Sequence, residues 1–180
     1  FGGSLSDDGR SVAFTRYLSA AESQVWRVDL DSGAQRQLLP AAGEAIKATH
    51  FDAGFSKNGK RLYVISDRAG EFRELMALDV ASGALTRISG HIPWDVTGAA
   101  LSEDGRWIVA QANVDGRDEL RVFDAATLKE SAAPAVPPGG IGTMGFHRGL
   151  HRMAYSINSA KGPSELFALD PVSGRSVQWT

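Results

Sequence analysis

The sequence predicts an all-β protein built from four copies of one unit, because two landmarks recur with the same step. The first landmark is a turn between two apolar runs, written LSDDGRSVAF from Leu5, FSKNGKRLYV from Phe55, LSEDGRWIVA from Leu101 and, in divergent form, FHRGLHRMAY from Phe146. The second is an aspartate that closes another apolar run, at Asp29, Asp79, Asp124 and Asp170. Both landmarks advance by about 45 to 50 residues per copy, which indicates a structural repeat.

The turn is the best-defined part of each copy. Asp8-Gly9, Asn58-Gly59 and Asp104-Gly105 are typical hairpin dipeptides, since Asn, Asp and above all Gly accept a positive φ. The fourth copy has Gly149-Leu150 at this place, with its glycine one position early. We therefore expect the fourth turn to have a different form.

Two short strands flank each turn. The strand before it pairs a small residue with a large apolar one, at Ser4-Leu5, Gly54-Phe55, Ala100-Leu101 and Gly145-Phe146. The strand after it contains an apolar run, at Val12–Phe14, Leu62–Ile65, Trp107–Ala110 and Met153–Tyr155. No run reaches about ten residues with a helical period before the next turn signal, which favours strands over helices.

A third and a fourth strand complete the copy. The third strand ends at the recurrent aspartate and places apolar residues at two equivalent positions, namely Val25, Leu75, Leu120 and Leu166, and Val28, Leu78, Phe123 and Leu169. The fourth strand is weaker and follows as RQLL from Arg36, LTRIS from Leu85 and SVQWT from Ser176. If the third-strand positions are buried, Leu78 belongs to the core.

Four strands in a period of about 45 residues are the signature of a β-propeller blade. We predict a β-propeller fragment of about four four-stranded antiparallel blades, at approximately residues 1–40, 41–90, 91–135 and 136–180 of a single partial propeller domain. The chain opens on the tail of a first strand and stops at the close of a fourth one, so we expect it to be a cut-out of a larger ring. An open arc of blades would expose apolar faces at its first and last blades and would self-associate through them.

Composition excludes several functions. Lys and Arg number 19 against 21 Asp and Glu, which leaves a net charge of −2 and no basic field for nucleic acid. No apolar run approaches the ~18 residues of a membrane helix, so no membrane partner is expected. The chain has no cysteine, which removes disulfide and thiolate chemistry and is compatible with a bacterial cytoplasm or periplasm alike.

The repeats resemble two groups of proteins. Segments such as SDRAGEFRELMALDVASGALTRIS from Ser66 resemble the TolB-like propeller repeats of bacterial proteins. The connector HIPWDV from His91 and the ending SGRSVQWT from Ser173 are more similar to the propeller of the prolyl oligopeptidase family of serine peptidases, in its bacterial dipeptidyl/acylaminoacyl peptidase-like branch. That resemblance covers the whole chain. It implies a propeller that caps a C-terminal α/β-hydrolase domain and restricts access to short or unfolded peptides.

No catalytic residue is predicted in this chain. The hydrolase nucleophile lies in a G-x-S-x-G turn between a strand and a helix, and no serine here has glycine at both required positions. Ser56 in GFSKNG comes closest, but its place in the repeat already explains it. We expect no cofactor site and no bound cofactor either.

Other polar residues are candidate site residues and leave alternatives open. His50 and Asp52 flank Phe51 on a first strand and could point into a central channel, as could His147. A metal-dependent propeller lyase would use such histidines, but the four histidines, His50, His91, His147 and His151, show no H-x-x-H or H-E-x-x-H spacing, so no metal ligand is predicted. The recurrent aspartates are expected to cap turns, and Trp94 is a candidate stacking surface beside Pro93.

The preferred interpretation is therefore a non-catalytic propeller part of a prolyl oligopeptidase-like serine peptidase, whose partners are its own hydrolase domain and peptide substrates. The alternatives are a TolB-like propeller that binds proteins through its loops and the metal-dependent lyase.

Overall fold

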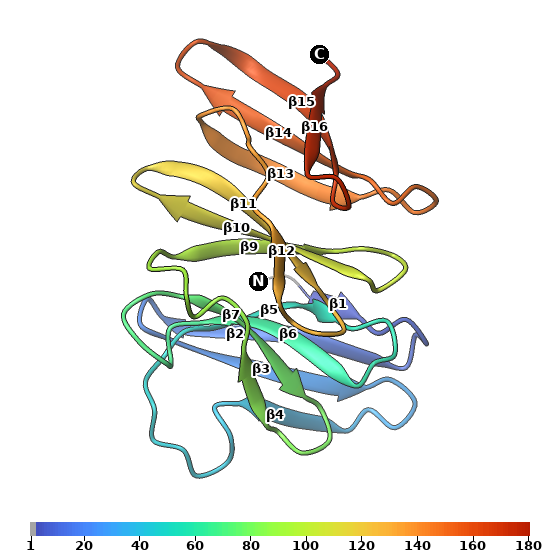
Figure 1. Ribbon diagram of the computed structural model, residues 1–180. Helices are drawn as coiled ribbons and strands as arrows, with labels where there is room; N and C mark the ends of the chain where they lie inside the picture. The colour runs from blue at the N-terminus through green and yellow to red at the C-terminus, as the bar shows by residue number, and fades with distance from the viewer. Residues whose placement is uncertain (1–2) are drawn as a thin grey trace. The chain divides into compact units, whose positions relative to one another are not determined.

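The computed structural model describes residues 3–180, and within this range it contains strands and no helix (Figure 1). The strands form four separate sheets, each with four antiparallel strands in sequence order. The first sheet consists of β1 (Gly3–Leu5), β2 (Ser11–Ser19), β3 (Glu22–Asp29) and β4 (Gln35–Leu39). The second consists of β5 (His50–Phe55), β6 (Arg61–Ser66), β7 (Glu74–Asp79) and β8 (Leu85–Arg87).

The other two sheets follow the same plan. The third consists of β9 (Val96–Leu101), β10 (Trp107–Val114), β11 (Arg117–Asp124) and β12 (Glu130–Ala132). The fourth consists of β13 (Gly140–Phe146), β14 (Met153–Ser159), β15 (Gly162–Asp170) and β16 (Arg175–Gln178). The predicted all-β class and the four four-stranded blades are confirmed.

The blades are grouped in two compact units. Unit 1 ends at Pro93 and holds the first two blades, and unit 2 begins at Trp94 and holds the last two. The assignment of the whole chain to one domain stays a prediction.

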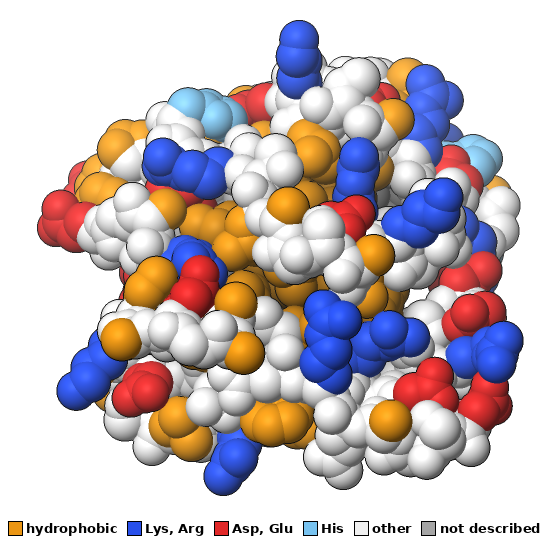
Figure 2. Space-filling view, turned by 90° about the horizontal axis from the view of Figure 1, so that it is seen from below, with side chains coloured by type: hydrophobic (Ala, Val, Ile, Leu, Met, Phe, Trp, Pro, Cys, Tyr) orange, Lys and Arg blue, Asp and Glu red, His pale blue; other side chains and the backbone are white. Residues whose placement is uncertain are grey.

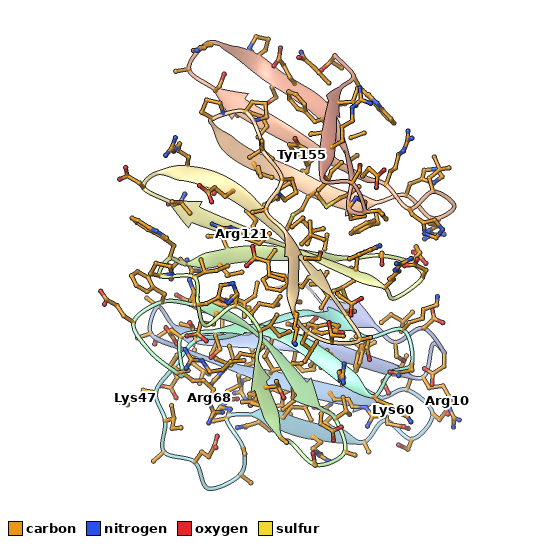
Figure 3. The ribbon with its side chains drawn as sticks, in the orientation of Figure 1. Arg10, Lys47, Lys60, Arg68, Arg121 and Tyr155 are labelled. Carbon is orange, nitrogen blue, oxygen red and sulfur yellow. The ribbon has the colours of Figure 1, made fainter. Side chains whose placement is uncertain are left out.

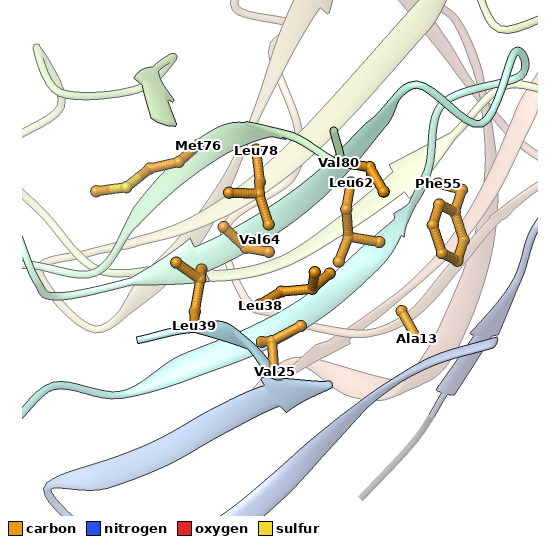
Figure 4. Packing of buried hydrophobic residues seen from close by; sticks show 10 residues of the cluster. All are labelled: Ala13, Val25, Leu38, Leu39, Phe55, Leu62, Val64, Met76, Leu78 and Val80. Carbon is orange, nitrogen blue, oxygen red and sulfur yellow. The ribbon is translucent and has the colours of Figure 1, made fainter. Parts of the chain in front are cut away.

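The core of unit 1 lies between its two sheets (Figure 4). Leu62 and Val64 lie on the same face of β6. In the register of β6 and β7, Leu62 pairs with Leu78 and Val64 pairs with Met76, so all four side chains share that face of the second sheet. The first blade contributes Ala13, Val25, Leu38 and Leu39 to the same cluster. This alternation is the period of two that a strand imposes on its side chains.

The core of unit 2 is built in the same way. The third blade supplies Trp107, Val109, Leu120 and Val122, and the fourth supplies Ile141, Met153, Tyr155, Ile157, Phe167 and Leu169. The rings of Tyr155 and Phe167 stack with their centroids 5.4 Å apart. Aromatic packing of this kind adds about 0.5–1.5 kcal/mol to the burial of the two side chains.

The turns between first and second strands show why the repeat keeps its sequence. Gly9, Gly59 and Gly105 have φ values of 70°, 67° and 70°, which glycine adopts without strain. In the first three turns a serine hydroxyl accepts a backbone N–H five positions on, as in Ser11 N to Ser6 Oγ at 2.9 Å. In the fourth turn the imidazole Nδ1 of His147 accepts the N–H groups of Gly149 and Leu150, both at 3.0 Å. The expected change of turn form is confirmed.

One third-strand position differs from its equivalents. Leu75 and Leu120 are fully buried, whereas Leu166 is 45% exposed. Leu169 and Phe167 on the same strand face the unit 2 core, so Leu166 lies on the opposite face of the fourth sheet. Equivalence in the repeat therefore did not guarantee equal burial.

Candidate functional site

Ser56 lies in a hairpin turn and its hydroxyl is occupied there. The hydroxyl donates to Asn58 Oδ1 at 2.9 Å and accepts the N–H of Arg61 at 2.9 Å. Ser6 and Ser102 make the same contacts in their own turns. A nucleophilic serine needs a base that takes its proton, and the contacts of Ser56 are those of a turn-forming residue.

The four recurrent aspartates each act within their own turn. The Asp29 carboxylate accepts the N–H and the hydroxyl of Ser32 at 2.9 and 2.6 Å. The hydrogen bond from the Ser32 hydroxyl is the largest cause that lowers the pKa of Asp29, and the bond from the Ser32 N–H adds to it. Equivalent contacts join Asp79 to Ser82, Asp124 to Thr127 and Asp170 to Val172 and Ser173. The aspartates are turn caps, as expected, and each one serves a different turn.

His50 is a buried residue and does not line an open channel. Its exposure is 0%, and its Nδ1 lies 2.8 Å from the hydroxyl of Ser66. Its backbone N–H and C=O both bond the hydroxyl of Ser23, in the first blade, at 2.7 Å. Nε2 is buried and has no hydrogen-bond partner within residues 3–180. Burial, together with the nearby positive charge of Arg68, lowers the pKa of His50 to about 4.

Asp52 joins the two blades of unit 1. Its carboxylate accepts the hydroxyl proton of Ser4 at 2.9 Å, and its backbone N–H donates to the hydroxyl of Thr15 at 2.9 Å. Burial raises the pKa of Asp52, and the hydrogen bond from Ser4 opposes that rise. Asp52, which the sequence placed as a candidate for the lining of a central channel, thus makes polar contacts between the two sheets of unit 1.

Asp118 has the corresponding role in unit 2. Its carboxylate accepts hydrogen bonds from Gln111 Nε2 at 2.9 Å, Asn113 Nδ2 at 3.2 Å and the backbone N–H of Ile141 at 2.7 Å. Ile141 lies on β13, the first strand of the fourth blade, so this carboxylate ties the two sheets of the unit together. Sequence reasoning missed Asp118, because it stands between the charged residues Arg117 and Glu119 at the start of β11, where nothing in the sequence signals its burial.

The remaining histidines are surface residues of turns and loops. His151 Nδ1 lies 3.0 Å from the Asp104 carboxylate, and this contact joins the first turn of the third blade to the first turn of the fourth. Lys57 and Asp7, 2.5 Å apart, join the corresponding turns of unit 1. His147 is the turn acceptor described above, His91 is exposed, and Trp94 is 37% exposed. Within residues 3–180, no three His, Asp or Glu side chains gather as a metal site would require.

Charged side chains of both signs are spread over the molecule. On the face that Figure 2 presents, Lys and Arg alternate with Asp and Glu, with hydrophobic side chains between them. In unit 1, Figure 3 shows Lys47 and Arg68 on the side of the β4–β5 connection and Arg10 and Lys60 on the side of the hairpin turns. Arg68 bonds both carboxylate oxygens of Glu44 at 3.0 and 3.2 Å. The described part of the chain forms no helix long and apolar enough to cross a membrane.

Comparison with known proteins identifies the repeat. Residues 1–180 match the family described as the prolyl oligopeptidase N-terminal β-propeller domain. The chain matches no curated protein.

Several solved structures share the fold. A prolyl endopeptidase structure is similar with a TM-score of 0.81 and 18% identity, over 98% of this chain and 25% of that one. A puromycin hydrolase gives a TM-score of 0.79 and 20% identity over 98% of this chain and 28% of that one. TolB from Acinetobacter baumannii is similar with a TM-score of 0.73 and 14% identity, over 100% of this chain and 43% of that one. The chain thus spans about a quarter of the length of the two peptidases that it resembles.

Proposed function

Because the chain belongs to the prolyl oligopeptidase N-terminal β-propeller family, we propose that it is the non-catalytic propeller part of a serine peptidase and controls which peptides reach a hydrolase domain. The observation that carries this proposal is the family match, which extends over residues 1–180. The hydrolase domain and the peptide substrates are the partners that the proposal implies.

The physical basis of such control is exclusion. Within each unit the two blades are held by an apolar core and by polar contacts, which are partly buried at Asp52 in unit 1 and buried at Asp118 in unit 2. Sheets fastened in this way resist opening, since parting them exposes apolar surface and leaves buried polar groups unpaired. A peptidase site covered by such sheets would admit short or unfolded peptides and reject folded proteins.

The test uses the native protein that contains this chain. Its rates of cleavage are measured on a short chromogenic peptide and on a folded protein that presents the same cleavable sequence in a surface loop. Removal of residues 1–180 should raise the ratio of protein cleavage to peptide cleavage. An unchanged ratio in a soluble, active truncated enzyme would contradict the gating role while leaving the family membership intact.

A TolB-like scaffold that binds other proteins is the second candidate, since TolB shares the fold over the whole chain. The sequence of the next ~250 residues encoded in the native gene decides between the peptidase and the scaffold. An α/β-hydrolase domain with G-x-S-x-G supports the peptidase, and its absence supports the scaffold. The metal-dependent lyase has no supporting ligand cluster in residues 3–180, and metal analysis of the purified chain tests it directly.

A further inference from the structure

The first strand of the second blade is fastened to the first blade through one residue, Ser23. Ser23 lies on β3, six positions before the recurrent aspartate, and it is fully buried. Its backbone N–H donates to Ala48 O at 3.2 Å, and its hydroxyl accepts the N–H of His50 at 2.7 Å. The hydroxyl also donates to His50 O at 2.7 Å. One residue of the first blade thus holds the segment that enters β5 at two points.

The third blade holds the fourth blade at the same position of the repeat. Asp118 lies on β11, six positions before the recurrent aspartate of its blade, and it is buried. Its backbone N–H donates to Gly139 O at 3.0 Å, and its carboxylate accepts the N–H of Ile141 at 2.7 Å. His50 and Ile141 also correspond, because each lies five positions before the phenylalanine that ends its strand. We call the position of Ser23 and Asp118 the anchor position.

The anchoring pattern belongs to the repeat and not to one pair of blades. In both units the anchor residue donates its N–H to a carbonyl that lies two positions before the residue held by its side chain. A hydroxyl holds that residue in unit 1 and a carboxylate holds it in unit 2, so the side chain must supply an oxygen that accepts an N–H. In both units the anchored strand belongs to the blade that follows in sequence.

The fourth blade has a serine at its anchor position. Ser164 lies on β15, six positions before Asp170. Ser23 and Asp118 are buried, whereas Ser164 is exposed. The hydroxyl of Ser164 forms no hydrogen bond with any residue from 3 to 180. The fourth blade therefore presents its anchor residue to solvent.

The surface beside Ser164 corresponds to one that is covered in unit 1. Leu166 has the place of Val25, four positions before the recurrent aspartate. Val25 is fully buried in the core between the first and second blades, whereas Leu166 is 45% exposed. By the alternation along β15, Ser164 and Leu166 lie on the face opposite to the unit 2 core. An apolar side chain next to an anchor residue is the combination that holds the second blade in unit 1.

The first blade has a second anchoring hydroxyl, and the fourth blade uses the corresponding one internally. The hydroxyl of Thr15 accepts the N–H of Asp52 at 2.9 Å. Ser156 has the corresponding place on β14, but its hydroxyl accepts the N–H of Thr143 in its own blade at 3.1 Å. Ser164 is therefore the residue on which anchoring by the fourth blade depends.

We propose that Ser164 is a positioning residue that anchors the first strand of a further blade of the same repeat, packed on the exposed face of the fourth blade. The Ser164 hydroxyl accepts an N–H of that strand, and the Ser164 N–H donates to the carbonyl two positions earlier. The further blade belongs to the native protein that contains this chain, because both anchored strands in units 1 and 2 belong to the blade that follows in sequence. The contact needs no hydrolase domain, so it is tested independently of the gating role.

Hydrogen exchange measured by mass spectrometry tests the proposal, because the backbone N–H of the anchor residue makes one of the two bonds. Exchange of the segment 162–166 is compared between the native protein and residues 1–180 alone. The segment should exchange about tenfold or more slowly in the native protein, since an N–H bonded within an interface exchanges only when that interface opens. The segments around Ser23 and Asp118 should be protected in both samples, because both anchors are bonded within residues 3–180.

Variants of the native protein separate the anchor from general packing. Ser164→Ala removes the acceptor, so exchange of the segment 162–166 should become about tenfold faster. Ser164→Asp should keep the wild-type rate, because a carboxylate has this role at Asp118. Asn113 donates to that carboxylate at 3.2 Å, and Asn158 has the corresponding place in the fourth blade. Lys161→Ala, in the adjacent turn, is the matched control and should also keep the wild-type rate.

Three results would each overturn the proposal, provided that unchanged exchange around Asp118 shows each variant to be folded. One is equally fast exchange of the segment 162–166 in the native protein and in the isolated chain. Another is a wild-type rate in Ser164→Ala. The third is an exchange rate in Ser164→Asp as fast as that in Ser164→Ala, which would mean that the acceptor oxygen does not hold the strand.

Discussion

At the scale of single residues, His50 makes the stability of the chain depend on pH. Its pKa falls from the ordinary 6.5 to about 4 on folding, because burial disfavours the imidazolium. The folded state therefore binds fewer protons at His50 than the unfolded state does. The associated stability is complete above pH 6.5 and is lost as the pH falls toward 4, by up to about 1.4 kcal/mol per pH unit.

We expect His50→Asn to remove this dependence, because asparagine can still meet the Ser66 hydroxyl and does not titrate. Urea unfolding of both proteins between pH 7 and 4 measures it. Asp52, whose raised pKa acts with the opposite sign, is present in both proteins and cancels in the difference. A difference in unfolding free energy that stays constant over this pH range would show that the imidazole does not lose its proton on folding.

At the scale of an element, the strand β7 places Leu78 in the core of unit 1, where it is fully buried. Leu78→Ala should lower the free energy of unfolding by about 2–5 kcal/mol, through lost burial and the cavity left behind. The matched control is Leu30→Ala in the turn after β3, since Leu30 is 49% exposed and its loss should cost no more than about 0.5 kcal/mol. Chemical denaturation measures both, and equal losses would contradict the register of β7.

At the scale of the whole molecule, the isolated chain should show no peptidase activity. It has no G-x-S-x-G turn, and the hydroxyl of Ser56 is committed to its hairpin. Assays with aminoacyl and peptidyl chromogenic substrates should therefore give the uncatalysed rate. Activity that accompanies the purified chain and disappears in Ser56→Ala would contradict this expectation.

Self-association is a second prediction at this scale, and it rests on large apolar side chains that the first and fourth blades expose. The first blade exposes Leu5 by 60%, and the fourth exposes Leu166 and Val177 by 45% and 44%. We propose that a second copy of the chain covers these side chains, because exposed apolar surface is removed from water when two copies associate. Light scattering should show concentration-dependent association, and a strictly monomeric 19.2 kDa species would contradict it.

A charge placed on one face provides the control for this measurement. Val177→Glu, on β16, should shift the equilibrium toward monomer, because a carboxylate in an apolar contact loses its hydration. Val172→Glu introduces the same charge in a turn, where the side chain is 63% exposed, and should leave the equilibrium unchanged.

The features that could be predicted from the sequence are the local ones. The hairpin turns, the alternation along β6 and β7 and the aspartate caps each depend on residues within a few positions of one another, so the repeat displayed them directly. The pKa of His50 and the burial of Leu75 but not Leu166 depend on what packs against each face, which the repeat does not encode. The contact of Asp118 with the fourth blade needed both levels. The carboxylate was visible in the sequence, but only the tertiary structure placed the N–H of Ile141 beside it, because such a hydrogen bond requires two distant segments of the chain to meet.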